Sequence, residues 1–299
     1  MTVSLAIDVS NLCYRSFHAF NSNKNKLSFR DRPTGVLFGF FRDLIQMSEF
    51  HRTDSFVFCF DSKTSVRREL FSEYKIKRIE SYEKSTKAEK RALGELREQV
   101  RLLKDEYLPR LGYGNIYHYE GYEADDLLAA YSHVTFPEEV LLVSSDKDLY
   151  SVLDPRVQIY DIFQKRTLSS QWFFSKYNLH PKEWVQLKAL MGDPSDSIPG
   201  VPGIGIKTAQ KYLSGTLDAN TSAMETIGNH WKKYKLYQKL VRIPFDLSVA
   251  EQIKVHADSF TVKAWKTLCE ELGFHSLMNT PPILNPFRSI KKKDYKYGK

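Results

Sequence analysis

Acidic residues end or open several of the segments that are predicted to form strands and helices in this chain. The run VSLAID ends in an aspartate, SFVFCF is followed by one, and EEVLLVSS leads into two more. Others open a predicted helix in YEADDLL or lie in the turn GDPSDS; the nine are Asp8, Asp61, Glu123, Asp125, Asp126, Asp146, Asp148, Asp193 and Asp196. Because the carboxyl ends of parallel strands share one edge of a sheet, where ligands bind, several segments can deliver these acids to a single site.

Such a convergence of acids has a chemical consequence. Carboxylates that meet in a partly desolvated cleft repel one another at a cost of several kcal/mol unless cations neutralise them. Ligand sets made only of oxygen select hard divalent ions such as Mg2+ or Mn2+. Two such ions about 4 Å apart clamp a phosphodiester for hydrolysis, since one helps to generate hydroxide and both stabilise the attacking and leaving oxygens. The acids therefore predict a two-metal hydrolytic site.

Each acid also has a purely structural interpretation. Asp and Glu cap helix starts, which accounts for the EADD cluster, and an aspartate after a strand often begins a turn. For any single acid the structural interpretation is favoured, but acids at so many element ends together favour a metal site. The other 27 Asp and Glu face 44 Lys and Arg, a surplus of 17 positive charges. A basic body around an acidic site suits an enzyme that attracts phosphate and holds metal.

The second chemical signal is the segment GDPSDSIPGVPGIGIKTAQKYL. Its glycines Gly200, Gly203 and Gly205 allow close backbone approach, while Pro199 and Pro202 stiffen the turn. The predicted helix that follows presents N–H groups and a positive dipole end that can hold a phosphate, and a lysine adds charge. A Rossmann fingerprint is excluded because no strand directly precedes the glycines, and the GxxxxGK[ST] spacing of a Walker A loop is absent. A plain helix connection is the alternative, which this density of Gly and Pro disfavours.

Short apolar runs that alternate with helical patterns must position these groups. The first twelve residues are interpreted as a short buried strand that ends at Asp8. Further strands are predicted at SFVFCF, GNIYHY, EEVLLV and RVQIYDIF, with helices over 34–50, over 93–108 and from Glu123 onward. This alternation predicts an α/β fold with a mostly parallel central sheet flanked by helices, followed by a more helical region from WFFSKY onward.

Residues 63–92 differ from the rest, because they are dense in both charges and poor in apolar side chains. Such a run is most often a solvated helical face. The alternative is a mobile helical element that grips a polyanion and becomes ordered on it. Lys75 and Arg78 lie three residues apart, so a helix would bring both to one face.

Composition excludes several other classes of protein. The chain has 299 residues, 42% of them hydrophobic, a net charge of +8 and three cysteines without metal-ligand spacing, so disorder, a disulfide scaffold and a Cys-ligated zinc site are disfavoured. No apolar stretch approaches the roughly 20 residues that span a bilayer. The N-terminus MTVSLAIDVS has no basic n-region and no small-residue cleavage site, so no signal peptide, no membrane partner and a reducing cytoplasm, bacterial or phage-infected, are expected.

Six motifs together resemble the 5′-nucleases of the flap endonuclease and 5′→3′ exonuclease family, which includes the N-terminal domain of bacterial DNA polymerase I and stand-alone phage enzymes. They are AIDVSNLCYR, FCFD, EYKIKR, EADD, SSDKD and ALMGDPSDSIPGVPGIGIKTA, and the resemblance covers residues 3–275. It implies a PIN-like α/β core over 1–178 with a helical arch at about 63–92. A helical region with a helix–three-turn–helix DNA-binding motif follows at 179–285, and 286–299 form a flexible basic tail.

The resemblance also implies roles for single residues. Asp8, Asp61, Glu123 and Asp125 would bind one metal ion and Asp146, Asp148 and Asp193 the other, with Asp126 and Asp196 acting from the second shell or through water. Arg15, Lys75 and Arg78 would reach the scissile phosphate or the threaded 5′ strand. The DNA contacts would be Arg67, Gly200, Gly203, Gly205, Lys207 and Thr208, the three-turn motif often working through a bound K+. The expected cofactors are two Mg2+ per site, for which Mn2+ can substitute.

Three departures from the family pattern touch no predicted metal ligand. Val9 stands where the family usually has Gly, Ser197 where it has Asn, and Ile206 where a Glu commonly precedes the motif lysine. These changes concern loop geometry rather than the chemistry. The resemblance thus predicts a monomeric, metal-dependent hydrolase of DNA that acts at 5′ ends, flaps or nicks in replication and repair.

Two alternatives stay open at this stage. A non-catalytic DNA-binding or replication-scaffold protein could keep the three-turn motif, but it should have lost some ligand acids, and this sequence has lost none. RNase H-like removal of RNA primers from RNA–DNA hybrids would use the same site as flap cleavage. The sequence therefore does not separate the second alternative from DNA cleavage, nor exonuclease from endonuclease activity.

Overall fold

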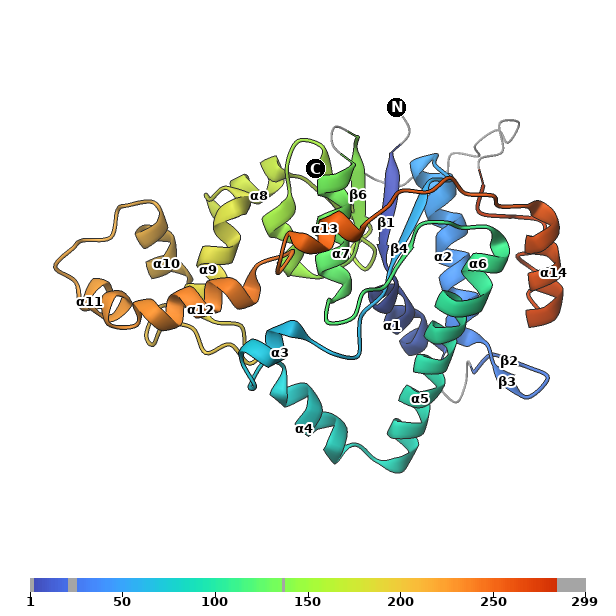
Figure 1. Cartoon of the computed structure of the whole chain (residues 1–299), viewed down its shortest axis with the longest axis horizontal. Helices are drawn as coiled ribbons and strands as arrows, with labels where there is room; N and C mark the ends of the chain where they lie inside the picture. Colours follow the sequence, from blue (N-terminus) through green and yellow to red (C-terminus); the bar gives the residue numbers. More distant parts are fainter. Residues whose placement is uncertain (1–2, 21–25, 136–137, 284–299) are drawn as a thin grey trace.

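The computed structural model describes residues 3–20, 26–135 and 138–283. A six-stranded sheet in the order β5-β4-β1-β6-β7-β8 forms its centre (Figure 1). The strands are β1 (Ser4–Asp8), β4 (Phe56–Cys59), β5 (Ile116–Tyr117), β6 (Val140–Val143), β7 (Val157–Asp161) and β8 (Arg166–Leu168). All neighbours pair in parallel except β7 and β8, so the prediction of a mostly parallel α/β sheet is confirmed.

Both faces of the sheet are buried, which explains why its central strands are continuous apolar runs. In β1, Leu5 and Ile7 point into one hydrophobic cluster, while Ala6 points into the other. Strands β4 and β6 alternate in the same way, with Phe58 on the side of Leu5 and Leu142 on the side of Ala6. The sheet therefore has two separate cores, one under each layer of helices.

Helices cover the two faces. On the face of Leu5 lie α1 (Val9–Phe20), α2 (Gly35–His51), α5 (Lys87–Leu102), η1 (Leu103–Tyr107), α6 (Leu108–Leu111) and α14 (Val262–Leu272). On the other lie α7 (Ala124–Val134), η2 (Lys147–Val152), α8 (Ser170–Tyr177), η3 (Pro181–Glu183), α9 (Trp184–Met191), α10 (Ile206–Leu213), α11 (Ser222–Asn229), α12 (Trp231–Val241) and α13 (Ser248–Gln252). None of the helices in the described ranges is both long and apolar enough to cross a membrane.

Helix α1 was not predicted. The strand interpretation of the first twelve residues is right only up to Asp8, because the chain turns into α1 at Val9. Leu12, Cys13 and Ser16 share the inward face of this helix, a helical spacing that the strand interpretation overlooked. A two-stranded hairpin, β2 (Ser28–Phe29) and β3 (Arg32–Pro33), then precedes α2, which lies within one residue of its predicted range.

The helical region after residue 178 packs closely on the α/β core. Leu187 and Leu190 of α9 belong to the same hydrophobic cluster as Leu128 of α7 and Leu142 of β6. The last helix, α14, instead lies on the opposite face, where Trp265 is fully buried against Phe41. The division at 178/179 stays a prediction, and the predicted basic tail at 286–299 lies outside the described residues.

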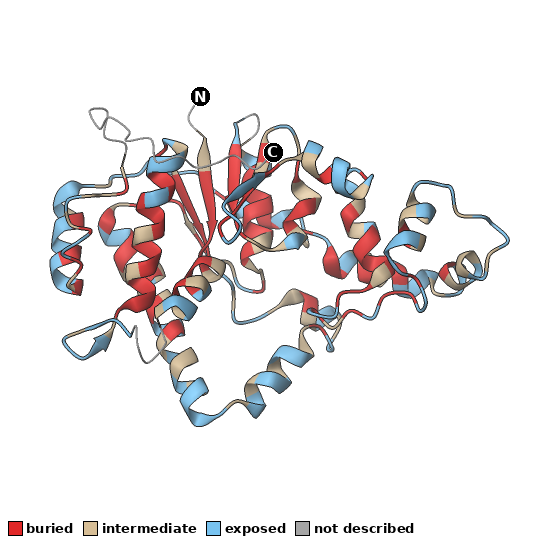
Figure 2. Ribbon diagram, turned by 180° about the vertical axis from the view of Figure 1, so that it is seen from behind, coloured by how far each residue is buried: buried red, intermediate tan, exposed pale blue. Residues whose placement is uncertain are grey.

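The charged segment predicted to form an arch is helical and leaves the body of the molecule. It comprises α3 (Val66–Leu70), α4 (Ile76–Lys84) and the first turns of α5, which meet in a V below the sheet (Figure 1). Helix α4 has no buried residue, and the V is mostly exposed in Figure 2. The far end of α5 returns to the core, where the Gln99 side chain accepts hydrogen bonds from the backbone N–H groups of Val36 and Leu37 at the start of α2.

Candidate active site

The first group of acids lies where β1, β4 and α7 meet at the carboxyl ends of the strands. Asp8 is the last residue of β1, and its two oxygens accept hydrogen bonds from the Asn11 N–H (2.9 Å) and the Ser144 hydroxyl (3.0 Å). Asp61 follows β4 by two residues, and it accepts a 2.8 Å bond from the N–H of Ala124, the first residue of α7. These bonds fix the acids while leaving oxygen lone pairs free for a ligand.

Like charges dominate this first group. Burial, followed by the charge of Asp61, raises the pKa of Asp8 to about 7. Burial, followed by the charges of Asp146 and Asp8, raises the pKa of Asp125 well above its usual range. The Asp125 Oδ1 atom is buried and has no hydrogen-bond partner among the described residues. A buried orphan carboxylate oxygen among other acids is a position that a hard cation would satisfy.

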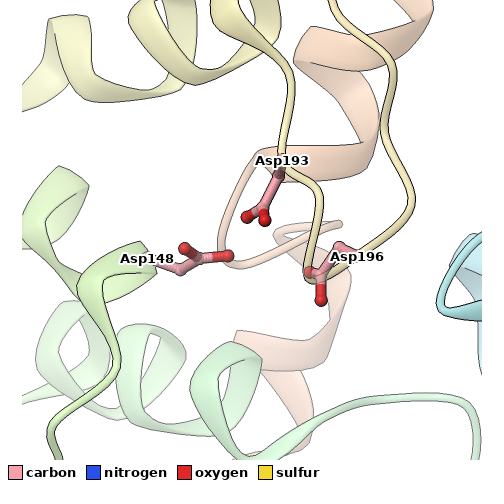
Figure 3. Close-up of side chains that lie close together, drawn as sticks. All are labelled: Asp148, Asp193 and Asp196. Carbon is pink, nitrogen blue, oxygen red and sulfur yellow. The ribbon is translucent and has the colours of Figure 1, made fainter. Parts of the chain in front are cut away.

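The second group consists of Asp148, Asp193 and Asp196. Each offers one carboxylate oxygen, and these three atoms lie within 4.8 Å of one another. Figure 3 shows the three side chains converging from η2 and from the turn that follows α9. This oxygen-only triad has the composition of a site for Mg2+ or Mn2+. Asp146 joins the two groups, because it caps η2 by accepting a bond from the Asp148 N–H and its charge acts on Asp125 and Asp8.

The turn that carries two of these acids is tightly constrained. The Asp193 Oδ1 atom accepts bonds from the Ser195 N–H (2.9 Å) and hydroxyl (2.6 Å), and Asp193 and Ile198 form a backbone bridge. Ser197 takes the left-handed conformation, with φ of 60°. Asn tolerates that conformation better than other non-glycine residues, which gives a physical reason for the Asn that the family usually has at this position.

Lys188 is a site residue that the sequence analysis missed. It is buried in α9, and its ammonium group lies between Asp148, which it contacts directly, and Asp193 at 2.5 Å. Burial alone would raise the pKa of Asp193, but Lys188 and the Ser195 bonds outweigh it and lower that pKa to about 2. Burial still holds the pKa of Asp148 at about 6, although Lys188 opposes it. The sequence feature that could have identified Lys188 is its position on the buried face of the apolar helical run WVQLKALM.

The foot of the arch bridges the two groups of acids. The Lys75 ammonium group lies 2.7 Å from Glu123 Oε1 and 3.9 Å from Asp196 Oδ1, and Arg78 lies 2.9 Å from the same Asp196 atom. The buried Tyr74 hydroxyl donates to both Glu123 (3.0 Å) and Asp196 (3.2 Å). Lys75 also has a positive φ of 56°, and a strained backbone conformation of this kind clusters at functional sites. Lys75 and Arg78 are therefore brought to the acids, and their predicted contact with the phosphate stays a prediction.

Two predicted site residues turn out to hold the fold together instead. Arg67 is 2% exposed and forms a bidentate pair with Asp126, at 2.6 and 2.7 Å. Its other donors bind the backbone oxygens of Leu240 and Arg242, and Asp126 also accepts a bond from the Phe245 N–H. The prediction that Arg67 contacts DNA is wrong, because the side chain is buried and its four hydrogen bonds are all made inside the protein. Both Asp126 oxygens also accept hydrogen bonds from protein groups, so this acid is not free to hold a metal ion directly, and its predicted role from the second shell or through water stays a prediction.

Arg15 lies apart from the arch residues. Its guanidinium group contacts Asp43 of α2, which also pairs with Arg42 at 3.0 Å. Asp43 is 1% exposed, so the two arginines neutralise a buried carboxylate. The predicted contact of Arg15 with phosphate stays a prediction, and the structure adds that such a contact would compete with Asp43.

The three-turn segment separates the predicted DNA contacts into two kinds. Gly200 is buried with φ of 74°, and a Cβ there would lie 2.3 Å from the backbone nitrogen of Gly192, so this glycine serves the turn. Gly203 and Gly205 have open space where a Cβ would stand, and Lys207 beside them is exposed. Gly205 caps α10, with Thr208 in its first turn. The segment thus presents an open helix start at these four residues, whereas Gly200 is required by the turn itself, and the predicted DNA contacts of all five residues stay predictions.

Comparison with known proteins agrees with this geometry. Residues 3–178 match the family model of the 5′-3′ exonuclease N-terminal resolvase-like domain, and residues 179–267 match that of the 5′-3′ exonuclease C-terminal SAM fold. The chain belongs to the 5′-3′ exonuclease family. The thermostable DNA polymerase I of Thermus aquaticus is 30% identical over 96% of this chain, and the match covers 34% of the polymerase. The chain therefore spans about a third of the length of that relative.

Two further relatives of the exonuclease family resemble the chain over most of their length. The 5′-3′ exonuclease of Buchnera aphidicola is 33% identical, with the match covering 69% of this chain and 67% of that protein. The crystal structure of the bacteriophage T5 flap endonuclease, in a complex with DNA and metal ions, has a TM-score of 0.67 at 21% identity. That match covers 90% of this chain and 94% of the phage chain, and it shows that the two share a fold.

We expect the Arg67–Asp126 pair to determine stability rather than DNA affinity. Arg67→Met should lower the free energy of unfolding by about 3–5 kcal/mol, because it leaves a buried carboxylate unpaired. The double substitution Arg67→Met/Asp126→Leu should recover part of this loss, and Arg68→Met should change stability by no more than about 0.5 kcal/mol. Denaturant unfolding measures all three; a stable Arg67→Met variant with weakened DNA binding would contradict the structural assignment.

A second prediction concerns the repulsion around Asp125. Because burial and neighbouring acids raise its pKa, the ionised carboxylate opposes folding at pH 8, so Asp125→Asn should raise the melting temperature of the chain in EDTA. Saturating Mg2+ should stabilise the original chain by about 2.7 kcal/mol per ion at 100 times Kd, and the variant less. Thermal unfolding with and without Mg2+ tests this, with Asp218→Asn as the control on a distant exposed loop; equal gains in both chains would argue against a metal at Asp125.

Proposed function

We propose that this chain is a structure-specific 5′-nuclease that hydrolyses DNA phosphodiesters at 5′ ends, flaps and nicks with two Mg2+ ions. The observation that carries the proposal is the meeting of two groups of acids at one edge of the sheet, with an orphan buried oxygen on Asp125 and with Lys75 and Arg78 at the foot of an exposed helical arch. The family membership and the DNA complex of the phage relative support the same activity.

The donor sets suggest which residues would hold the two ions. Asp8, Asp61 and Asp125 would hold one, and Asp148, Asp193 and Asp196 the other, with Glu123 and Asp146 between them. Bound ions would supply positive charge for the phosphate and lower the pKa of an attacking water, and Mn2+ suits the same oxygens. Asp196 would bind the second ion directly, whereas the sequence analysis expected it to act from the second shell or through water.

The cations of the site would change partners when substrate binds. Lys75 and Arg78 now neutralise Glu123 and Asp196, and a phosphate with bound ions would take over that charge balance. Both cations would then be free to stabilise negative charge that develops on the phosphate oxygens. Lys188 would hold Asp148 and Asp193 in place by neutralising one of the two charges.

The rest of the substrate would lie along the helical region. The open start of α10 at Gly203, Gly205, Lys207 and Thr208 suits a phosphate of the duplex backbone, directly or through K+. A monomer suffices, since all proposed site residues come from one chain. The three cysteines Cys13, Cys59 and Cys269 are free and buried, which fits the cytoplasmic location that we propose.

The activity itself is tested with labelled substrates. Cleavage of a 5′-flap and a nicked duplex should require Mg2+ or Mn2+ and stop in EDTA, and Asp148→Asn should abolish turnover while keeping DNA binding in Ca2+. An RNA–DNA hybrid in the same series separates primer removal from flap cleavage. Cleavage in excess chelator would contradict the two-metal site, and tight DNA binding without any cleavage would indicate a non-catalytic DNA-binding protein.

The arch foot gives a further prediction. Lys75→Ala should lower the single-turnover rate on a 5′-flap by about one to three orders of magnitude, with a smaller loss of affinity, because Lys75 would act on charge that develops during reaction. Lys77→Ala is the matched control, since the Lys77 side chain is exposed in the first turn of α4, two residues after Lys75. If both variants cleave at the original rate, the foot of the arch is only a solvated helix.

A further inference from the structure

A pocket lies at the amino ends of the strands, on the edge of the sheet opposite the acids of the candidate active site. Its volume is about 660 Å3, within the roughly 300–1,000 Å3 of ligand pockets in proteins. Ser4 at the start of β1, Ser55 before β4 and Thr135 after α7 line its floor. None of these residues belongs to the proposed nuclease site, so the pocket is independent of that function.

One wall of the pocket is a segment that crosses the amino edge of the sheet between α13 and α14 (Figure 1). Asn115 fixes this segment by donating to the His256 oxygen and accepting from its N–H, both at 2.8 Å. The Ser259 N–H donates to the Gly112 oxygen at 2.7 Å. A Cβ on Gly112 would lie 2.5 Å from the Ser259 backbone, so this glycine permits the close approach. These hydrogen bonds and the close packing hold this wall of the pocket in a fixed position.

The lining is acidic and aromatic. Asp54, Glu138 and Asp258 contribute three carboxylates, and none of the described residues in the lining is a lysine or an arginine. Asp258 uses Oδ1 to accept from the Gly114 N–H at 2.8 Å. Burial raises the pKa of Asp258 above its usual range and the nearby charge of Asp54 adds to this rise, although the hydrogen bonds from Gly114 and Asn115 oppose it. A cationic group is the chemical partner that such a lining favours.

Tyr113 adds a second and independent indication of a ligand. Its side chain is 5% exposed and lines the pocket, packed against Phe58 and Phe260. Its hydroxyl is buried and has no hydrogen-bond partner among the described residues. A buried hydroxyl without a partner is costly, and a backbone carbonyl of a bound peptide would accept its proton. The pocket thus suits a peptide that carries positive charge.

The chain itself supplies such a peptide next to the pocket. Ile283, the last described residue, is part of the lining. The sixteen residues that follow, LNPFRSIKKKDYKYGK, contain six Lys and Arg and a single Asp, together with Phe287 and two tyrosines. This segment begins at the pocket, so little loop-closure entropy opposes its binding there. Its charge and its aromatic side chains both complement the lining.

We propose that the pocket at the amino edge of the sheet is the docking site of the chain's own basic segment 284–299. Its lysine and arginine side chains pair with Asp258 and Glu138, and a backbone carbonyl accepts from the Tyr113 hydroxyl. Docking would hold this basic segment at the edge of the sheet away from the proposed nuclease site. The proposed nuclease activity does not depend on it.

Tryptic cleavage of the full-length chain tests the docking. Trypsin cuts after Arg288 and Lys291, and its rate follows the fraction of time that a segment is undocked. Tyr113→Phe removes only the unpartnered hydroxyl, and Asp258→Asn keeps the acceptor for Gly114 while removing the charge. Both variants should lose the segment about fivefold faster than the original chain at low salt. The control Asp31→Asn, on the exposed hairpin, should cleave at the original rate.

Mass spectrometry of the products gives each rate, beside that of the free peptide LNPFRSIKKKDYKYGK. About 0.5 M NaCl should bring the original chain close to the variants, because it screens the ion pairs. The proposal is overturned if the segment in the original chain is cut as fast as the free peptide. It is also overturned if cleavage is slow in every variant, or if only added DNA protects the segment, since the segment then docks elsewhere or on nucleic acid.

Discussion

Repulsion between carboxylates is the interaction on which the rest of the molecule depends. Parallel strands bring Asp8, Asp61 and Asp146 to one edge of the sheet, and the start of α7 adds Asp125. Such a cluster is stable only if other groups balance its negative charge. In this chain, the two groups of acids differ in how well their charge is balanced. The second group has Lys188 in contact with it, whereas the first relies on hydrogen bonds from Asn11, Ser144 and Ala124. The first group is therefore where a divalent ion gains most.

The arch depends on the same charges. Lys75 at its foot is held by Glu123 and by its N–H bond to the Asp196 oxygen, so the helix that leaves the body starts from the acids themselves. Arg67, just before this foot, is anchored to Asp126 and to the end of α12. A buried bidentate pair is a costly way to gain stability but a specific one. In this chain it fixes the base of an otherwise exposed element relative to both α7 and the helical region.

The molecule also separates its charges by location. Acids gather at the carboxyl edge of the sheet, and a second acidic lining lies at the amino edge around Asp258. Basic residues such as Lys207 and those of α4 lie on exposed surfaces. A polyanion is thus attracted to the basic surfaces but repelled from the acids unless metal ions neutralise them. The proposed binding of metal ions and of nucleic acid would therefore be coupled through the charge of these acids.

The sequence by itself determined the sheet and the positions of most acids. Short apolar runs fixed β1, β4, β6 and β7, and strand ends carry acids to one edge wherever strands are parallel. Only the tertiary structure decided which charges are paired. In the sequence, Lys188 looks like part of an apolar helix, and Arg67 looks like one of many cations in a charged run. Their partners, Asp148 and Asp126, lie 40 and 59 residues away in the sequence. Charge pairing is set by distance in space, which local patterns do not encode, whereas burial on both faces of a strand is a local property of its residues.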